Sequence, residues 1–361
     1  MAAIGLMGEA KYQFLPGPLG LTITKEDKNE LESIGSTASV FVRRVRNWYD
    51  EEKTKSRGSR LAALLEKGVP SEYVKSSTST ALPFTMMVDT VWTSLGWRIV
   101  EIDVTNRNAM GYPLVMRHIY DLSSVWRGID HAWREEGWSG VIQVMADHHR
   151  FYEPYFRFFL KQLGGELVTE ADLPDWIRQN HLSIYKLLDL PILFRSKAVL
   201  PELLALSQAA KVAIPPVHAL SSKAVLALPW ESEQFGGDPI MKYVPETRFL
   251  WRVFTPPGKE FFVKLLQSGG AHGTFHNDHE KLERFLMERR PQAIWQEALP
   301  LAQRSIAYLT SDNQLITENR FVRISIFITE HGEVVDADAT ASPGTIVHGS
   351  KQSIMTVPVL M

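Results

Sequence analysis

The chain contains no cysteine, and this absence excludes several chemistries at once. Disulfide frameworks, thiolate zinc sites, iron–sulfur clusters and cysteine nucleophiles all need the missing thiol. The sequence also lacks an excess of charge of either sign, since 39 Lys and Arg face 41 Asp and Glu in 361 residues, for a net charge of -2. Such a balance gives no electrostatic footprint for nucleic acid or for an anionic membrane.

Long hydrophobic runs are missing as well. No stretch of about 18 apolar residues occurs, so the sequence predicts no membrane span. Residues 1–20 have a short apolar start but no basic region, and we read no signal peptide there. Hydrophobic residues make up 45% of the chain and charged residues 22%, which is the ordinary range of globular proteins. We therefore expect a soluble cytoplasmic protein that binds neither nucleic acid nor membrane.

Turn residues and hydrophobic periodicity divide the chain into three parts. Residues 1–80 are predicted to be mostly helical, with Thr24 and Asp27 in a capping-box pattern at a helix start. Residues 81–215 and 216–361 each mix strands with helices, which predicts an α/β fold. Helical character is expected over 24–49, and further helices over 61–67, 122–136, 151–163, 222–230 and 278–289. The expected strands cover 84–93, 97–104, 140–145, 167–169, 261–266, 293–297, 304–309, 321–329 and 334–337.

An acidic cluster falls on the first predicted hairpin. Asp89 lies on its first strand, and Glu101 and Asp103 lie two apart on its second, so they share one face. The turn between the strands can place Asp89 opposite Glu101. Clustered carboxylates of this kind suit Mg²⁺ that bridges substrate phosphates. Carboxylates on a solvent-exposed sheet face are the alternative, and Asp336 and Asp338 compete for the same metal role.

A lysine on a strand precedes a glycine-rich turn in the last third of the chain. Lys264 is followed by residues 267–273, and such glycines let backbone N–H groups approach a phosphate while the lysine adds charge. The segment matches neither a Walker A loop nor a dinucleotide fingerprint. A plain glycine-rich hairpin turn is the alternative. Adjacent His148 and His149 follow another strand, and we interpret residues 147–150 as a substrate-contacting loop rather than a zinc site.

The order of these segments resembles the glutathionylspermidine synthase-like ATP-grasp ligases. Residues 222–231 look like the family segment that carries its first nucleotide lysine, here Lys223. Residues 262–273 resemble the segment with the second lysine and the phosphate loop, and residues 294–300 resemble the adenine hinge. The family's magnesium ligands correspond to Asp89, Glu101 and Asp103. The resemblance covers roughly residues 83–361.

The resemblance implies a permuted ATP-grasp fold, with a preceding α/β substrate region and a helical N-terminal segment. It also implies ATP and Mg²⁺, with phosphorylation of a substrate carboxylate and attack of an amine on the acyl phosphate. Lys223 and Lys264 are expected to neutralise the phosphates, and Gly269 and Gly270 to close over them. The nucleotide's adenine and ribose are expected at Gln296, Glu297 and Ala298. An amino acid, peptide or polyamine is the expected kind of substrate.

Departures from the family pattern leave the substrates open. The family's Glu-x-Asn is Glu101-x-Asp103 here, and Met87 stands where the family has an arginine that holds the reacting carboxylate. Arg107 and Arg117 are candidates to replace that arginine. The length and the missing cysteine also indicate that the family's amidase half is not present. A non-catalytic binding or scaffold protein and a small-molecule kinase are the alternatives, and self-association into a homo-oligomer is left open.

Overall fold

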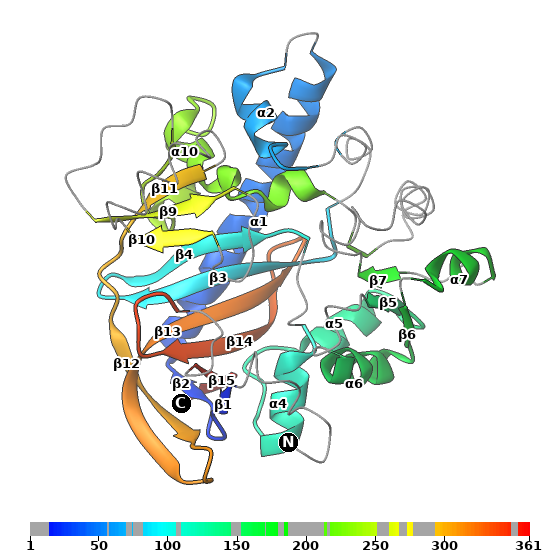
Figure 1. Ribbon diagram of the computed structural model, residues 1–361, viewed down its shortest axis with the longest axis vertical. Coiled ribbons are helices and arrows are strands. Elements are labelled where there is room, and N and C mark those ends of the chain that lie inside the picture. Colours follow the sequence, from blue (N-terminus) through cyan, green and yellow to red (C-terminus); the bar gives the residue numbers. More distant parts are fainter. Residues whose placement is uncertain are drawn as a thin grey trace.

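The computed structural model describes most of the chain as a mixed α/β fold with four sheets (Figure 1). The described residues are 14–55, 58–69, 74, 82–105, 110–145, 153–169, 171–179, 184–186, 213–214, 217–250, 260–266, 273–276, 293–347 and 353–361. This confirms the α/β class expected from the sequence. No helix in these ranges is long and apolar enough to cross a membrane.

The predicted hairpin forms the centre of the main sheet. Its strands β3 (Thr85–Thr93) and β4 (Gly96–Asp103) pair antiparallel, with Thr93 opposite Gly96. Gly96 has a φ of +96°, a conformation that residues with a side chain rarely adopt, and this makes the tight turn feasible. The sheet continues through β13 (Leu315–Thr329), β14 (Val334–Ser342), β15 (Ile354–Thr356) and β1 (Leu15–Pro16), with β12 (Gln303–Leu309) paired to β13. Strands β13 and β14 are both longer than the sequence predicts.

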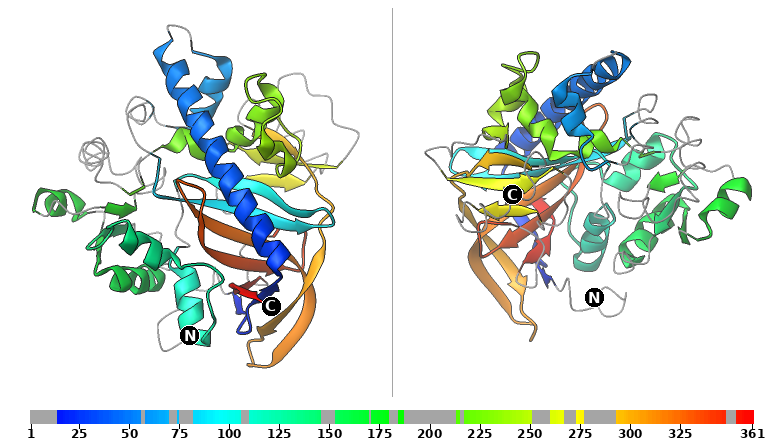
Figure 2. Two further views of the ribbon diagram at one scale, coloured as in Figure 1. Left: turned by 180° about the vertical axis from the view of Figure 1, so that it is seen from behind. Right: turned by 45° about the horizontal axis from the view of Figure 1, so that its top comes forward.

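One long helix covers one face of this sheet. Helix α1 (Lys25–Thr54) has 30 residues and continues past residue 49, the last residue of the expected helical stretch. It begins as expected, since Thr24 and Asp27 form the capping box. Its apolar side shares a core cluster with the main sheet, which includes Phe41, Val88 and Ile326. Helix α1 therefore crosses the back of strands β3, β4, β13 and β14 (Figure 2).

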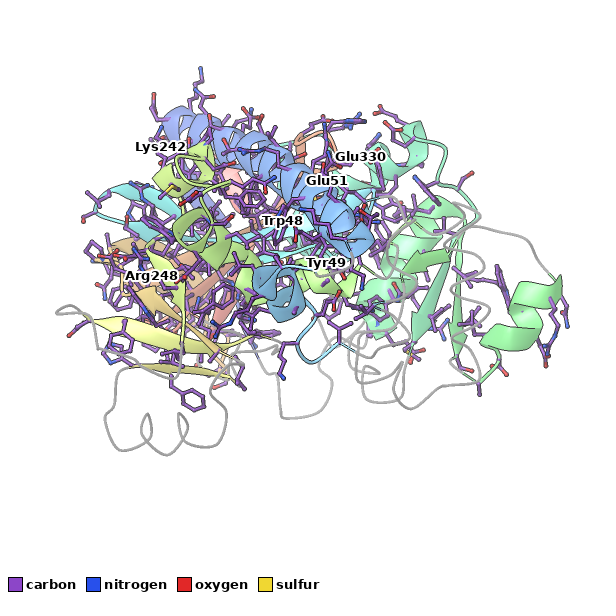
Figure 3. The ribbon with its side chains drawn as sticks, turned by 90° about the horizontal axis from the view of Figure 1, so that it is seen from above. Trp48, Tyr49, Glu51, Lys242, Arg248 and Glu330 are labelled. Atoms are coloured by element: carbon purple, nitrogen blue, oxygen red, sulfur yellow. The ribbon has the colours of Figure 1, made fainter. Side chains whose placement is uncertain are left out.

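The loop between β13 and β14 reaches back to α1. The carbonyl oxygen of Glu330 accepts hydrogen bonds from Ser39 Oγ at 2.5 Å and from Arg43 Nη2 at 2.6 Å. Figure 3 shows Glu330 beside the helix. Further along α1, Trp48 packs edge-on against Phe235 with ring centroids 5.5 Å apart. These contacts hold α1 against the β13–β14 loop and against the segment between α10 and η7.

The opposite side of the main sheet meets a smaller α/β unit. It contains α4 (Tyr112–Tyr120), α5 (Ile129–Glu135), α6 (Glu153–Leu163) and α7 (Leu173–Gln179), with the parallel strands β6 (Glu166–Thr169), β5 (Ile142–Met145) and β7 (Ile184–Lys186). The expected helix over 122–136 is wrong at its start. Gly128, at a φ of +93°, comes immediately before Ile129, and α4 was not predicted at all.

A third unit lies over the β4 edge of the main sheet (Figure 1). Its antiparallel strands are β10 (Thr274–His276), β9 (Phe261–Leu265), β11 (Ala293–Glu297) and β8 (Thr247–Phe249). The 3₁₀ helices η5 (His218–Ser221), η6 (Lys223–Ala227) and η7 (Pro239–Lys242) and the α-helices α10 (Leu228–Glu231) and α2 (Arg60–Leu65) accompany it. The helix expected over 222–230 is thus a 3₁₀ helix followed by a short α-helix that begins at Leu228, with Pro229, a residue without an N–H, in its first turn. The helix expected over 278–289 lies outside the described residues.

Asp27 joins α1 to the main sheet through three hydrogen bonds from two partners. Its carboxylate accepts two hydrogen bonds from Arg304, at 2.6 and 2.9 Å, and one from Trp97 Nε1 at 3.0 Å. We expect Asp27→Ala to lower the free energy of unfolding by about 2–4 kcal/mol, because it leaves a guanidinium and an indole N–H without their acceptor. Urea denaturation measures this, with Asp312→Ala in an exposed turn as the control.

The pH dependence gives a second check on Asp27. Burial raises the pKa of its carboxyl. Hydrogen bonds from Arg304 and from the Thr24 backbone together lower this pKa by more than burial raises it, so it lies below its ordinary value. Stability from such a group is present above about pH 4 and is lost as the pH falls through the lowered pKa. The difference between wild type and Asp27→Ala should therefore shrink in acid, and a difference that grows in acid contradicts this account.

Candidate functional site

A row of polar residues crosses the main sheet on the face opposite α1. Asp338 on β14 pairs with Ser325 on β13, Ser325 pairs with Asp89 on β3, and Asp89 pairs with Glu101 on β4. Residues directly opposite one another point to the same face of a sheet. These four residues form what we call the polar row. The pairing confirms the predicted position of Asp89 opposite Glu101.

Asp89 lies buried near the middle of the polar row. Arg323 Nη1 donates to Asp89 Oδ2 at 3.2 Å, whereas the buried Asp89 Oδ1 has no hydrogen-bond partner among the described residues. Burial raises the pKa of Asp89, the Arg323 guanidinium opposes this, and the nearby Glu101 adds to it. Arg323 did not appear among the predicted site residues. The alternating pattern over 321–327 already placed it on the face of Ser325, and that was the available signal.

The two predicted nucleotide lysines come together at β4. Lys223 Nζ, from η6, lies 2.9 Å from Glu101 Oε1. Lys264 Nζ, from β9, donates to Val100 O at 3.0 Å and to Gln296 Oε1 at 2.6 Å. Burial lowers the pKa of Lys264 to about 8, while Glu101 raises it and Lys223 lowers it. Three segments far apart in the sequence therefore place two ammonium groups beside the polar row.

The predicted hinge lies on β11, next to Lys264. Gln296 Nε2 donates to Thr247 Oγ1 at 3.1 Å, so both ends of this side-chain amide are held. The next N–H groups are also used, since Glu297 N donates to Glu246 O at 2.8 Å and Ala298 N donates to Glu260 O at 2.9 Å. Because the Ala298 N–H is already bonded, an adenine base at this end of β11 would have to bind other backbone groups.

Several predicted residues fall in the part of the chain that is not described. Arg107, Gly269, Gly270 and the segment 147–150 all lie outside the described residues. Their proposed roles in phosphate and substrate contact therefore stay predictions from the sequence.

The predicted metal ligands do not form one group. Asp103 lies on β4, two residues after Glu101 and opposite Met87 on β3. Its Oδ1 accepts hydrogen bonds from Thr105 N at 3.1 Å and from Ser221 Oγ at 3.3 Å. Within the described ranges, no three His, Asp or Glu side chains gather closely enough to hold a metal together. Mg²⁺, however, commonly uses only one or two carboxylates together with phosphate oxygens and water. Asp89, with its unpartnered buried oxygen, and the adjacent Glu101 fit that smaller donor set.

Arg117 has a different place from the one predicted. From α4 it donates to Asp336 Oδ1 at 2.5 Å and Oδ2 at 2.7 Å, and both side chains are almost fully buried. The Asp336 carboxylate also accepts from the backbone N–H of Ile129 at 3.1 Å. Arg117 is therefore committed to Asp336, and these contacts give no support to the predicted role as a clamp for a substrate carboxylate.

Comparison with known proteins rests on structure. No protein-family model matches the sequence, and neither does any curated protein. A candidate gamma-glutamylcysteine synthetase from Methylobacillus flagellatus KT covers 84% of this chain and 86% of its own at 11% identity. Its TM-score of 0.31 is too low to support an argument.

One solved structure resembles the chain over nearly its whole length. A glutathione synthetase-like effector from Globodera pallida, in its apo form, covers 97% of this chain and 91% of its own. The TM-score is 0.57 and the identity 12%, so the likeness concerns the fold alone. The predicted resemblance to glutathionylspermidine synthases in particular is not shown. The chain has a mixed α/β fold similar to that of a glutathione synthetase-like protein.

Proposed function

We propose that the chain is an ATP-dependent carboxylate–amine ligase with a permuted ATP-grasp nucleotide site. The observation that carries this proposal is the meeting of Lys223 and Lys264 with Glu101 and Asp89 at the junction of two sheets. Two buried cations beside two carboxylates are a suitable setting for a nucleotide triphosphate with its divalent metal. The synthetase-like fold of the matched effector supports the same class.

The lysines are proposed to hold the nucleotide phosphates. Lys264 donates only to two uncharged oxygens in the contacts described above, so its positive charge is available to an anion. Lys223 donates a hydrogen bond to Glu101, which is also a proposed metal ligand. When a metal ion neutralises the Glu101 carboxylate, Lys223 would turn toward the phosphates. Adenine and ribose would then lie along the end of β11, near Gln296 and Glu297.

Asp89 and Glu101 are proposed as the metal ligands. Bound Mg²⁺ would draw charge from the transferred phosphoryl group. Asp103, held in its turn by Thr105 and Ser221, would support the end of β4 rather than complete the ligand set.

Arg323 is proposed to orient the acid substrate. Arg323 lies next to Asp89, on the sheet face that carries the polar row. There it can perform the role of the family arginine whose position is occupied by Met87 in this chain. The acid carboxylate would attack the γ-phosphorus and release ADP. The amine nitrogen would then attack the acyl carbon, form the amide, release phosphate and lose a proton to solvent.

The test combines a binding assay with product analysis. Purified protein is heated with and without ATP and Mg²⁺, and a rise in the melting temperature reports binding to the native state. ADP and amide products are then sought by mass spectrometry after incubation with pooled amino acids, peptides and amines. We expect both a shift and an amide product. Binding without ADP would favour the non-catalytic alternative, ADP without an amide would favour the kinase, and no binding would contradict the proposal.

A further inference from the structure

Asp338 is a buried carboxylate at the end of the polar row. Its side chain is only 2% exposed, and its Oδ1 has no hydrogen-bond partner among the described residues. Burial raises the pKa of this carboxyl to about 7, against the influence of Arg323. A buried carboxylate without a full set of partners is unfavourable, so its position calls for an explanation.

Arg323 stands on a strand that is flanked by two carboxylate-bearing strands. It stands on β13, the strand between Asp89 on β3 and Asp338 on β14. Nη1 donates to Asp89, while Nη2 reaches β14 at Thr340 Oγ1, 3.5 Å away and two residues from Asp338. Asp336, the other acid on this face of β14, is held by Arg117. Arg323 is therefore ion-paired with Asp89, and its charge also acts on Asp338, whose pKa it lowers against the effect of burial.

Asp89 is also a proposed metal ligand. Its ion pair with Arg323 therefore cannot stay unchanged when a metal ion binds. A divalent ion on Asp89 would place two further positive charges beside the guanidinium. The repulsion between them would favour movement of Arg323 toward β14, where an unpartnered carboxylate oxygen lies ready. Two neighbouring strands are about 4.8 Å apart, so the guanidinium end needs to move only a short way.

We propose that Arg323 exchanges its carboxylate partner, from Asp89 in the metal-free protein to Asp338 when the metal ion is bound. Asp338 is then a positioning residue, which holds Arg323 away from the metal and toward the acid substrate. The inference rests on the proposed function, because it takes Asp89 as a metal ligand. It also explains why a carboxylate is kept buried two strands away from the proposed metal.

The exchange predicts a specific coupling in metal binding. The probe is Mn²⁺ titrated into the full chain in the presence of ADP at pH 8, with free Mn²⁺ measured by electron paramagnetic resonance. Without the Asp338 carboxylate, Arg323 loses the charged partner to which it is proposed to move, and it competes for Asp89. We therefore expect Asp338→Asn to weaken Mn²⁺ binding by about 10- to 100-fold, the range for a lost charge-assisted hydrogen bond. Asp175→Asn on α7, 72% exposed, is the matched control and should not change it.

A double-mutant cycle separates this exchange from a general loss of structure. In an Arg323→Gln background the competing guanidinium is gone, so adding Asp338→Asn should have almost no further effect on Mn²⁺ binding. Thr340→Val keeps every charge and removes the hydroxyl that accepts from Arg323 Nη2 and donates to Met355 Sδ, and it should weaken binding in the same direction by about 2- to 10-fold. Thermal unfolding verifies that each variant is folded.

Two results would overturn the inference. Equal effects of Asp338→Asn with and without Arg323 would show that the residues act independently, and an unchanged Mn²⁺ affinity would show that Asp338 has no such part. Either could occur while the wild-type chain binds Mn²⁺ and ADP, which leaves the proposed function standing. Absence of Mn²⁺ binding in the wild type itself would contradict both proposals.

Discussion

Replacing Lys264 with alanine is expected to weaken the binding of ADP with Mg²⁺ by about 100-fold or more, because it removes a buried charge that no other described residue supplies at this position. The lost ammonium group also leaves Val100 O and Gln296 Oε1 without their donor. Isothermal titration calorimetry measures the affinity. Lys67→Ala, at an exposed position after α2, is the control and should bind like wild type.

The pH dependence of nucleotide binding tests the same residue without a mutation. Burial lowers the pKa of Lys264 to about 8, so the free protein loses this charge as the pH rises through that value. Affinity for ADP should then fall by up to about tenfold for each pH unit above 8. Stability moves the other way, since a lysine with a lowered pKa binds fewer protons in the folded state and favours folding as the pH rises from 8 toward 10.5. A constant affinity up to pH 9.5 would contradict the role of Lys264.

Replacing Arg117 with methionine is expected to lower the free energy of unfolding by about 3–5 kcal/mol. The guanidinium makes two hydrogen bonds to a carboxylate that is only 2% exposed, and its removal leaves the Asp336 charge buried. Chemical denaturation gives the value. The exposed ion pair of Arg178 with Asp175 provides a matched control, and Arg178→Met should cost less than about 1 kcal/mol.

A second variant separates the ion pair from its surroundings. Changing Arg117 to methionine together with Asp336 to asparagine removes both charges and keeps an acceptor for the Ile129 N–H, and most of the lost stability should return. If Arg117→Met instead abolishes turnover and leaves stability unchanged, the residue serves as the substrate clamp that the sequence indicated, and its assignment to a structural ion pair is wrong.

Local patterns account for the parts of the fold that the sequence predicted well. Thr24 and Asp27 cap a helix three residues apart, and the β3–β4 hairpin brings Asp89 to Glu101 across a short turn at Gly96. Each of these features depends on neighbours in the chain. Segment 222–231 was found by resemblance, yet its expected helix was wrong, because Pro229 lies within it.

Pairing between distant segments explains what the sequence did not reveal. Arg323 meets Asp89 across 234 positions, and no short pattern records which strand will lie beside β3. The partner of Arg117 was hidden for the same reason, since Asp336 is 219 positions away. A charged residue on a strand can face solvent, a ligand or a buried partner, and only the register of β13 and β14 decides among them.

The two ends of the described chain pair with each other. Strand β1 runs parallel to β15, and β2 (Leu21–Ile23) runs parallel to β16 (Pro358–Leu360). During synthesis, strands β1 and β2 must therefore wait until β15 and β16 have left the ribosome before they find their partners. Contacts of such long sequence separation slow folding and prolong the time for which strand edges stay open to other chains. We therefore expect chaperones to bind the growing chain and its yield to depend on the rate of translation.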